Sequence, residues 1–321
     1  MSISVLIPAY NCSKTIQATL DSVLAQTRRP DQVIVMDDGS TDDTLALVES
    51  YRPRVTVLRQ PNKGVAAARN ALCGQAQGDL IAFLDADDVW HPRYLEVQNG
   101  LFEKHPNAAA FFTGHTSFCG YGSFTWDAAS DRTSMDAELI NPLDFLRRYN
   151  ATGDFACMSF CCVPKKALTE MGSEYFCISA AEDAYFCNTL PLLDRPVVYF
   201  PHALVAYRVS GTSLSANQFR VYSSLIQVFQ LLEGRYNQLG NTDLLAAFRL
   251  AFASKRRTYA KILMGTGDSV EARRQFWLSL RDSHATVSWA KSLALLLITW
   301  FPERLQPNWP ITTRPLINAR D

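Results

Sequence analysis

Three carboxylates follow a hydrophobic run at residues 83–88, which read FLDADD. Asp85, Asp87 and Asp88 would repel one another at the end of a strand unless a positive charge binds between them. Carboxylate oxygens combined with phosphate oxygens form the octahedral shell that a hard divalent cation such as Mg2+ or Mn2+ prefers. Taken alone, the motif is more often a solvated Asp-rich turn, because acidic turns are common. Its meaning therefore depends on the motifs around it.

A second acidic segment, VIVMDDGSTDDT at residues 33–44, also begins as a β-rich run and breaks into small and acidic residues. Asp38 or Asp37 could accept a hydrogen bond from the N–H of a base, a geometry that suits the imide of uracil. Helix capping explains one of these carboxylates but not both. In NKGVAAARN at residues 62–70, Arg69 offers a planar fork to a phosphate or a base carbonyl, unless the segment is an ordinary surface helix.

An acidic pair, Glu182 and Asp183, lies further along the chain in AAEDAYF at residues 180–186. A carboxylate can act as the general base that removes the proton of an attacking hydroxyl. The alternative is an acidic pair at the start of a helix, where the helix macrodipole favours negative charge. Spacing alone leaves both roles open.

These side chains need elements that bring them together, and β-rich runs with helix-like runs between them supply such elements. The predicted strands are residues 4–8, 32–36, 54–58 and 80–84, and the predicted helices are residues 15–26, 41–51 and 64–76. Right-handed crossovers then build a doubly wound, mostly parallel α/β sheet. In such sheets ligands bind beyond the carboxyl ends of the strands. We therefore expect residues 9–11, 37–40 and 85–88 to converge on one crevice.

Taken in order, SVLIPAYN, VIVMDDGSTDDT, NKGVAAARN and GDLIAFLDADD resemble family 2 of the inverting glycosyltransferases. The resemblance is strong over residues 4–92 and returns at residues 182–183 and 207–215. It implies a GT-A fold, the α/β fold of nucleotide-diphospho-sugar transferases, for a catalytic domain at residues 1–215. It implies little about the C-terminal region at residues 216–321, which is predicted to be helical. The helices expected there are residues 222–239, 242–264 and 269–283.

The resemblance also implies roles for single residues. Asp183 is the expected base, and Asp87 with Asp85 is expected to hold Mn2+ or Mg2+ under the diphosphate. The family often has a His as a further metal ligand, and this position is Ser210 here, so the metal site rests on the two aspartates. The residues expected to contact the nucleoside are Pro8, Tyr10, Asp38, Arg69 and Asp85.

By the same resemblance the chain is a metal-dependent enzyme that takes a sugar from a nucleotide diphosphate sugar, expected to be a UDP-sugar. The acceptor is a hydroxyl of a glycan or lipid-linked molecule, transfer inverts the anomeric carbon, and the expected process is cell-surface polysaccharide synthesis. Two alternatives stay open: a nucleotidyltransferase-like enzyme, and a non-catalytic protein that binds sugar nucleotides. Neither GxGxxG nor GxxxxGK[ST] occurs, which removes the usual support for hydride transfer and ATP hydrolysis.

The 321 residues have a formal net charge of zero and are 48% hydrophobic, which excludes a disordered chain and gives no case for nucleic-acid binding. Residues 1–215 hold 17 Lys and Arg against 24 Asp and Glu, whereas residues 216–321 hold 14 against 7. An acidic half suits a divalent metal, and a basic half suits an anionic phospholipid surface. Ordinary scatter explains the difference equally well.

Residues 288–305 contain an uncharged run of only ten residues, 292–301, which includes Trp300 and lies between Trp289 with Lys291 and Arg304. This run is shorter than the roughly 18 residues that span a bilayer. We expect the segment either to lie at a membrane interface or to pack against the other helices. The N-terminus has neither a basic region nor a cleavable apolar region, so the expected location is the cytoplasm, with peripheral contact at the inner face of the membrane.

Overall fold

The computed structural model describes residues 1–121, 124–126, 136–153, 155–172, 174–209, 217–282 and 286–299. Ser210, Trp300 and Arg304, to which the sequence drew attention, lie outside the described residues. The chain forms two compact units: Met1–Pro142 with Gly153–Gly211, and Leu143–Thr152 with Thr212–Asp321. The second unit therefore takes in a helix from the middle of the chain as well as the C-terminal region.

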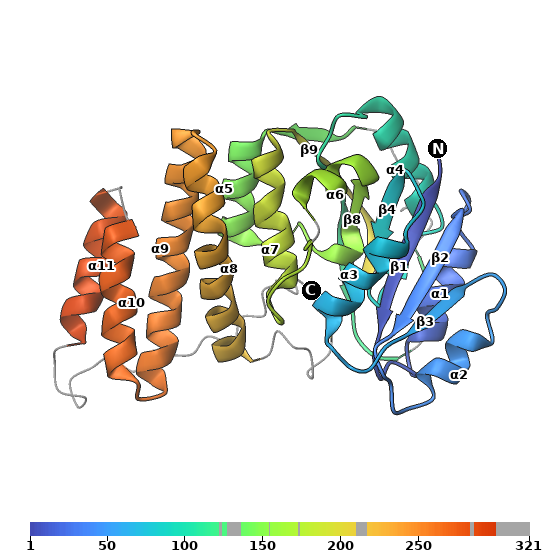
Figure 1. The fold of residues 1–321 in the computed structure, drawn as a ribbon, viewed down its shortest axis with the longest axis horizontal. Coiled ribbons are helices and arrows are strands. Elements are labelled where there is room, and N and C mark those ends of the chain that lie inside the picture. Colours follow the sequence, from blue (N-terminus) through green and yellow to red (C-terminus); the bar gives the residue numbers. More distant parts are fainter. Residues whose placement is uncertain are drawn as a thin grey trace. The chain divides into compact units, whose positions relative to one another are not determined.

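The first unit contains a mixed sheet, which has nine strands in the described residues (Figure 1). The strands are β1 (Ile3–Ala9), β2 (Gln32–Asp37), β3 (Thr56–Arg59), β4 (Leu80–Phe83), β5 (Val89–Trp90), β6 (Ala110–Phe118), β7 (Glu138–Ile140), β8 (Cys161–Pro164) and β9 (Val197–Arg208). Their order is β3-β2-β1-β4-β8-β6-β9-β5, with β7 paired to β9. β3, β2, β1 and β4 run parallel, and β8 is antiparallel to both β4 and β6. The α/β sheet expected from the sequence is confirmed, with antiparallel strands added beyond β4.

The helices of this unit are α1 (Ile16–Leu24), α2 (Thr44–Glu49), α3 (Val65–Gln75), α4 (Tyr94–Lys104), α6 (Lys165–Met171) and α7 (Glu182–Thr189), with short 3-10 turns η2 (Met158–Phe160) and η3 (Leu190–Leu193). Crossovers, right-handed by the general rule, lead from β1 to β2 and on to β3, and the next crossover returns to β4 on the other side of β1. Because the direction reverses, α1 and α2 cover one face of the sheet and α3 covers the other (Figure 1).

The central strand β1 is buried along its whole length. A parallel strand covered by helices on both faces reads as a continuous apolar run rather than an alternating one, which is the pattern of ISVLIPA. The chain passes very close to β1 at Gly78, where an added Cβ would lie 2.5 Å from the backbone nitrogen of Ser4. Only glycine fits this approach without a backbone shift.

The carboxyl ends of β1, β2 and β4 lie together, as the sequence predicted. Asp38 N donates to Ala9 O at 2.8 Å. The prediction that a helix starts at residue 41 is wrong, because hydrogen bonds to the loop between β1 and α1 hold residues 40 and 41 in a turn before the helix. Asn11 Oδ1 accepts from Thr41 N at 2.8 Å, and Asn11 N donates to Ser40 Oγ at 3.0 Å. α2 begins only at Thr44.

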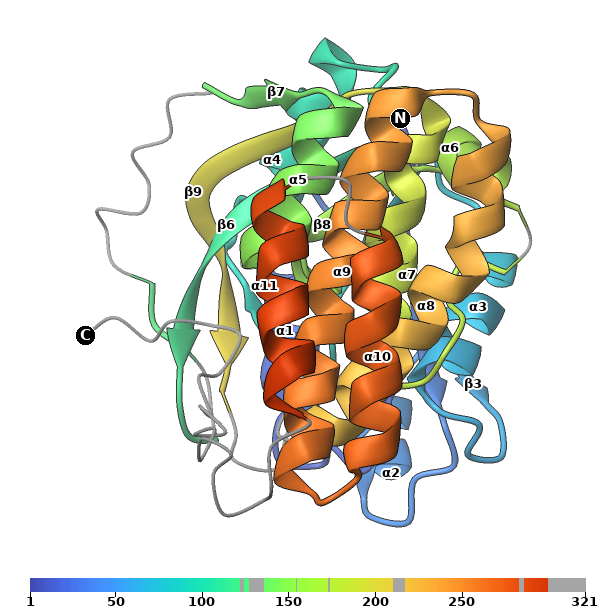
Figure 2. The same cartoon turned by 90° about the vertical axis from the view of Figure 1, so that its left-hand side faces the viewer.

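The second unit consists of helices in its described residues (Figure 2). They are α5 (Pro142–Thr152), α8 (Gln218–Gln238), α9 (Thr242–Gly265), α10 (Ser269–Asp282) and α11 (Thr286–Ile298). Asn217 caps α8 by accepting from Arg220 N at 3.0 Å, and Asn241 caps α9 by accepting from Leu244 N at 3.1 Å. The turn between these helices uses Gly240 with φ +74°, so α8 and α9 pack as neighbours.

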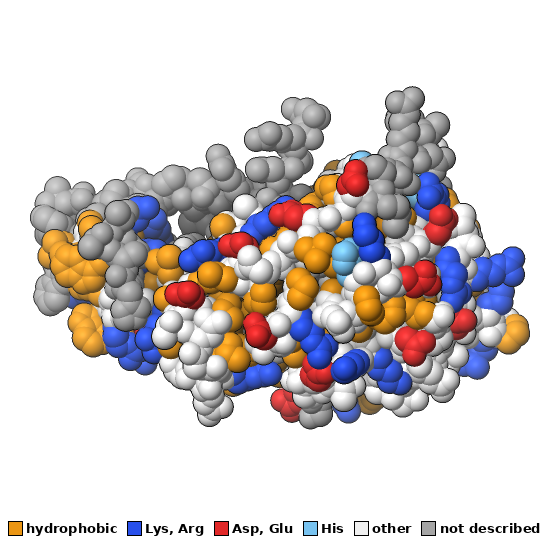
Figure 3. Space-filling view, turned by 90° about the horizontal axis from the view of Figure 1, so that it is seen from above, with side chains coloured by type: hydrophobic (Ala, Val, Ile, Leu, Met, Phe, Trp, Pro, Cys, Tyr) orange, Lys and Arg blue, Asp and Glu red, His pale blue; other side chains and the backbone are white. Residues whose placement is uncertain are grey.

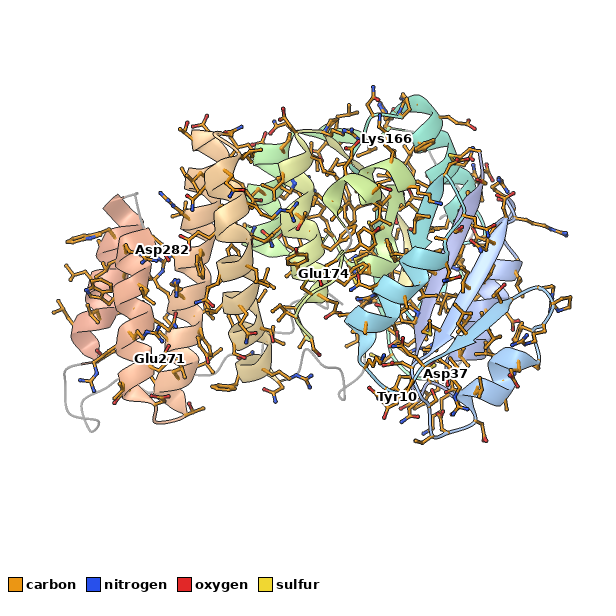
Figure 4. All side chains as sticks on the ribbon, viewed as in Figure 1. Tyr10, Asp37, Lys166, Glu174, Glu271 and Asp282 are labelled. Atoms are coloured by element: carbon orange, nitrogen blue, oxygen red, sulfur yellow. The ribbon has the colours of Figure 1, made fainter. Side chains whose placement is uncertain are left out.

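A buried ion pair joins α9 to α10. Arg256 Nε lies 2.7 Å from Asp282 Oδ2, and Arg256 Nη1 donates to Gln275 Oε1 at 2.9 Å (Asp282 is labelled in Figure 4). The guanidinium also lies 3.8 Å from the ring centroid of Phe252. Burial of a charge is tolerated when it is paired and hydrogen-bonded in this way. Part of the positive charge of the C-terminal region is therefore internal.

No helix in the described part of the chain has the length and apolar character that a membrane span requires. On the face drawn in Figure 3, acidic and basic side chains are interspersed on both units. The opposite net charges of the two parts of the sequence thus do not produce two uniformly charged surfaces on this face.

Candidate active site

The acidic loop at residues 85–88 is held from both sides. Asp85 N donates to Ser159 Oγ at 3.0 Å, and Ala86 O accepts from Thr15 Oγ1 at 2.9 Å. Ser159 belongs to η2 and Thr15 precedes α1, so segments far apart in the sequence fix this backbone. Hydrogen bonds to these segments thus fix the backbone of the loop, which differs from the solvated turn that the motif alone would suggest.

Arg208, at the end of β9, fixes the other side of the loop. Its backbone N–H donates to Asp88 Oδ1 at 2.8 Å, and its Nε donates to Asp87 O at 2.7 Å. Its Nη1 donates to Gly120 O. Asp88 is fully buried, and its carboxylate accepts the hydrogen bond from the backbone N–H of Arg208. Asp85 and Asp87, which remain partly exposed, are the carboxylates of this loop that a ligand can reach.

The carboxylates crowd one another. Burial, followed by the negative charge of Asp85, raises the pKa of Asp87 to about 6. A divalent cation would relieve this repulsion, and the oxygen ligands on Asp85 and Asp87 suit Mg2+ or Mn2+. No cluster of three or more His, Cys, Asp or Glu suited to a metal occurs among the described residues. An ion held by Asp85 and Asp87 would take its remaining ligands from a bound molecule or from water.

Arg69, on α3, bridges two acids from distant segments of the chain. Its Nη2 lies 2.5 Å from Asp85 Oδ1, and its Nη1 lies 2.8 Å from Glu182 Oε1. The side chain is only 4% exposed. Arg69 was expected to contact the nucleoside, and in the structure both of its terminal nitrogens are engaged by carboxylates.

Asp38 holds the loop that leads into α3. Its Oδ1 accepts from Lys63 N at 2.9 Å, and its Oδ2 accepts from Gly64 N at 2.8 Å. Gln60 Nε2 donates to the same carboxylate at 2.7 Å. A carboxylate has about four lone-pair sites, so these bonds leave room for one further donor. Contact of Asp38 with a base remains a prediction.

The other expected nucleoside contacts lie at the same end of the sheet. Pro8 is buried within β1, whereas Tyr10, just beyond that strand, is 48% exposed (labelled with Asp37 in Figure 4). Asp37 is buried, accepts from Ser40 N at 3.2 Å, and lies 3.3 Å from Arg59 Nε. Asp37 and Asp38 are the two candidates for hydrogen bonding to a base, and Asp37 is the more deeply buried of the two.

Glu182 and Asp183 begin α7. Asp183 Oδ1 accepts from the N–H of Ala184 at 2.7 Å. Burial, together with the negative charges of Glu182 and Asp85 and against the positive charge of Arg69, raises the pKa of Asp183 to about 6. Because Arg69 contacts both Asp85 and Glu182, the acidic loop and the acidic pair lie in one site, although about a hundred residues separate them.

Several residues that shape this site carried no recognisable signal in the sequence. Ser159 and Thr15 have no motif of their own, since they act through single hydrogen bonds to backbone. Arg208 was noted only as part of the late segment that resembles the family, and not as the residue that holds the acidic loop. Asn70 lies inside a recognised motif without an assigned role.

Comparison with known proteins identifies the family. The family model described as Glycosyl transferase family 2 matches residues 4–168. The chain belongs to this family. The match covers the strand ends and the acidic loop, and it stops before Glu182 and Asp183.

Individual relatives match only the first part of the chain. A chondroitin synthase of Escherichia coli is 40% identical over 114 residues, which are 35% of this chain and 17% of that protein. WfaP of Escherichia coli, a UDP-Glc:alpha-D-GlcNAc-diphosphoundecaprenol beta-1,3-glucosyltransferase, is 43% identical over 90 residues, which are 27% of this chain and 36% of that protein. The matched segments thus span well under half of these relatives.

Solved structures extend the likeness to nearly the whole chain. Residues 1–349 of S. aureus TarS superpose with a TM-score of 0.68 at 20% identity, covering 95% of this chain and 90% of that one. The same protein in complex with UDP-GlcNAc gives a TM-score of 0.65 at 21% identity, covering 95% and 91%. At this identity the likeness establishes the fold, the GT-A type expected from the sequence.

Proposed function

We propose that this chain is an inverting glycosyltransferase that moves a sugar from a UDP-sugar to a hydroxyl of a glycan or lipid-linked acceptor. The observation that carries the proposal is the joining of Asp85, Asp87 and Asp183 in one site, with Arg69 bridging Asp85 and Glu182. Relatives support the substrate class, since one is a chondroitin synthase and another a UDP-glucose transferase acting on a diphosphoundecaprenol-linked sugar. A role in cell-surface polysaccharide synthesis follows from such acceptors.

The chemistry assigned to the chain is a single displacement. Asp183 accepts the proton of the acceptor hydroxyl while that oxygen attacks the anomeric carbon, and the bond from this carbon to the diphosphate oxygen breaks. The electron pair of that bond leaves with UDP, so the configuration at the anomeric carbon inverts. Asp85 and Asp87 would hold Mg2+ or Mn2+, which supplies positive charge to the departing diphosphate.

A panel of nucleotide sugars tests this function. We expect one UDP-sugar to raise the melting temperature in Mn2+ more than in EDTA, since a ligand at a hundredfold excess over its Kd stabilises by about 2.7 kcal/mol. That donor should then release UDP slowly in the absence of acceptor. Binding without any release of UDP would favour the non-catalytic alternative. Pyrophosphate released from a nucleoside triphosphate and a sugar phosphate would favour the nucleotidyltransferase.

Peripheral contact with a membrane is part of the proposal, and α10 offers a suitable face. Val270, Arg274, Trp277 and Arg281 recur at the spacing of one helical face, and all four side chains are exposed. Trp289 on α11 is 47% exposed. Aromatic and basic side chains together suit the interface of an anionic bilayer.

We expect the full chain to bind vesicles that contain anionic phosphatidylglycerol and to lose this binding as salt rises. The double variant Trp277→Gln, Trp289→Gln should bind several-fold less, because it removes the apolar side chains that would insert. Leu139→Gln is the control, since Leu139 is 53% exposed on the first unit. Co-sedimentation measures all three proteins. Equal binding by the double variant and the control would show that the two tryptophans do not contribute to membrane binding.

A further inference from the structure

The segment that leads into α7 is attached to α3 by the side chain of Asn70. Asn70 Oδ1 accepts from Tyr175 N at 3.1 Å and from Phe176 N at 3.0 Å, and Asn70 Nδ2 donates to Phe176 O at 2.7 Å. One amide side chain thus satisfies three backbone groups of a segment more than a hundred residues away. Figure 4 labels Glu174, the residue just before this attachment.

The neighbouring residue, Arg69, holds the other end of the same segment. Its ion pair with Glu182 fixes the first residue of α7. Its guanidinium also lies 5.5 Å from the ring centroid of Phe176. The Phe176 ring stacks on Phe186 of α7 at 5.2 Å and packs edge-on against Phe83 of β4 at 5.5 Å. Two consecutive residues of α3 therefore hold residues 175–182 at both ends.

Between these attachments the backbone is strained. Ile178 has φ +59° and Ala180 has φ +69°, in the left-handed region that is unfavourable for residues with a Cβ and most of all for a β-branched one. Such conformations persist where the surrounding contacts impose them. Asp183 follows directly, so its location depends on whether the attachments at Asn70 and Arg69 hold.

We propose that Asn70 is a positioning residue, which together with Arg69 fixes residues 175–182 and thereby places Asp183 for reaction. The inference rests on the proposed role of Asp183 as the base. It assigns the Arg69–Asn70 pair a task on the acceptor side of the site, in addition to the contact of Arg69 with Asp85. Neither the amide of Asn70 nor the backbone that it holds is among the groups proposed to contact the nucleotide.

Hydrogen exchange measures the attachment directly. In Asn70→Ala we expect peptides covering residues 174–183 to exchange about tenfold faster or more, because the N–H groups of Tyr175 and Phe176 lose their acceptor. In Asn70→Asp the acceptor remains and the donor is lost, so the exchange rate should be intermediate. Asn99→Ala is the matched control, since Asn99 lies on a helix of the same unit and its side chain donates to Glu103 of that helix at 2.8 Å. Unchanged exchange in Asn70→Ala, or an increase spread evenly over the whole unit, would overturn the proposal.

Two further measurements separate positioning from a general loss of structure. The affinity for UDP with Mn2+, measured by calorimetry, should stay within about twofold of wild type in Asn70→Ala. The rate of UDP release from the selected UDP-sugar should fall about tenfold or more in this variant, and Asn70→Asp should recover part of that rate. An equal loss of UDP affinity would contradict the assignment to the acceptor side. If exchange rises as expected but Asp183→Asn retains turnover, the base is wrong and the attachment stands. If Asp183→Asn is inactive and exchange is unchanged, the base stands and the attachment is wrong.

Discussion

Asp183→Asn is expected to lower sugar transfer by about 10²-fold or more while leaving the affinity for UDP nearly unchanged. The amide has almost the shape of the carboxylate, so the substitution removes proton acceptance and keeps packing. Asp183 also accepts a hydrogen bond from Ala184 N, which the amide oxygen can still accept. Transfer is measured with the donor selected from the panel and an acceptor, and UDP affinity by calorimetry.

Glu182→Gln is the matched variant and should reduce transfer less. It weakens the ion pair with Arg69 but leaves the proposed base in place. Near-normal turnover in Asp183→Asn together with an inactive Glu182→Gln would move the role to Glu182. Near-normal turnover in both variants would leave the reaction without a base from this segment.

The dependence of the rate on pH is a second test of Asp183 as the base. Because burial raises the pKa of Asp183 to about 6, the base is protonated below that pH and the rate should rise as pH increases through about 6. Glu182 adds to this shift through its negative charge, so Glu182→Gln should move the rise to lower pH. A profile that is flat from pH 5 to 8 in the wild type would contradict the assignment.

Asp87→Asn is expected to weaken Mn2+-dependent binding of UDP by about tenfold or more. Asp85 is already paired with Arg69, and Asp88 is buried against the backbone of Arg208, so Asp87 is the least committed carboxylate of the loop. Calorimetry with UDP is done with Mn2+ and with EDTA. Without metal the variant and the wild type should bind alike, which serves as the internal control.

Protons should compete with the metal at this site. The pKa of Asp87 is raised to about 6, so the Mn2+ dependence of UDP binding in the wild type should weaken as pH falls through that value. Asp87→Asn has no carboxylate there to protonate, and its weaker binding should change little over the same range. A variant that keeps the metal dependence of the wild type would show that Asp87 is not a ligand.

The sequence by itself determined the parallel part of the sheet and the edge at which the site forms. β1, β2 and β4 lie within a residue or two of the predicted runs, since a strand buried on both faces needs an uninterrupted apolar sequence. The acidic motifs follow these strands directly. Parallel strands end at the same edge, so the gathering of Asp38 and Asp85 there could be foreseen from order along the chain alone.

Only the tertiary structure decided which partner each polar side chain takes. Arg69 pairs with Glu182, 113 residues away, and Asn70 bonds the backbone of Phe176, 106 residues away. Periodicity records which face of an element is buried, and it carries no information about which distant segment covers that face. Side-chain hydrogen bonds are short and directional, so they form between whichever groups the packing of the sheet and helices brings within about 3 Å. For this reason the types of residue in the site were readable from the sequence, whereas the attachment to α3 of residues 175–182, which lead to Asp183, was not.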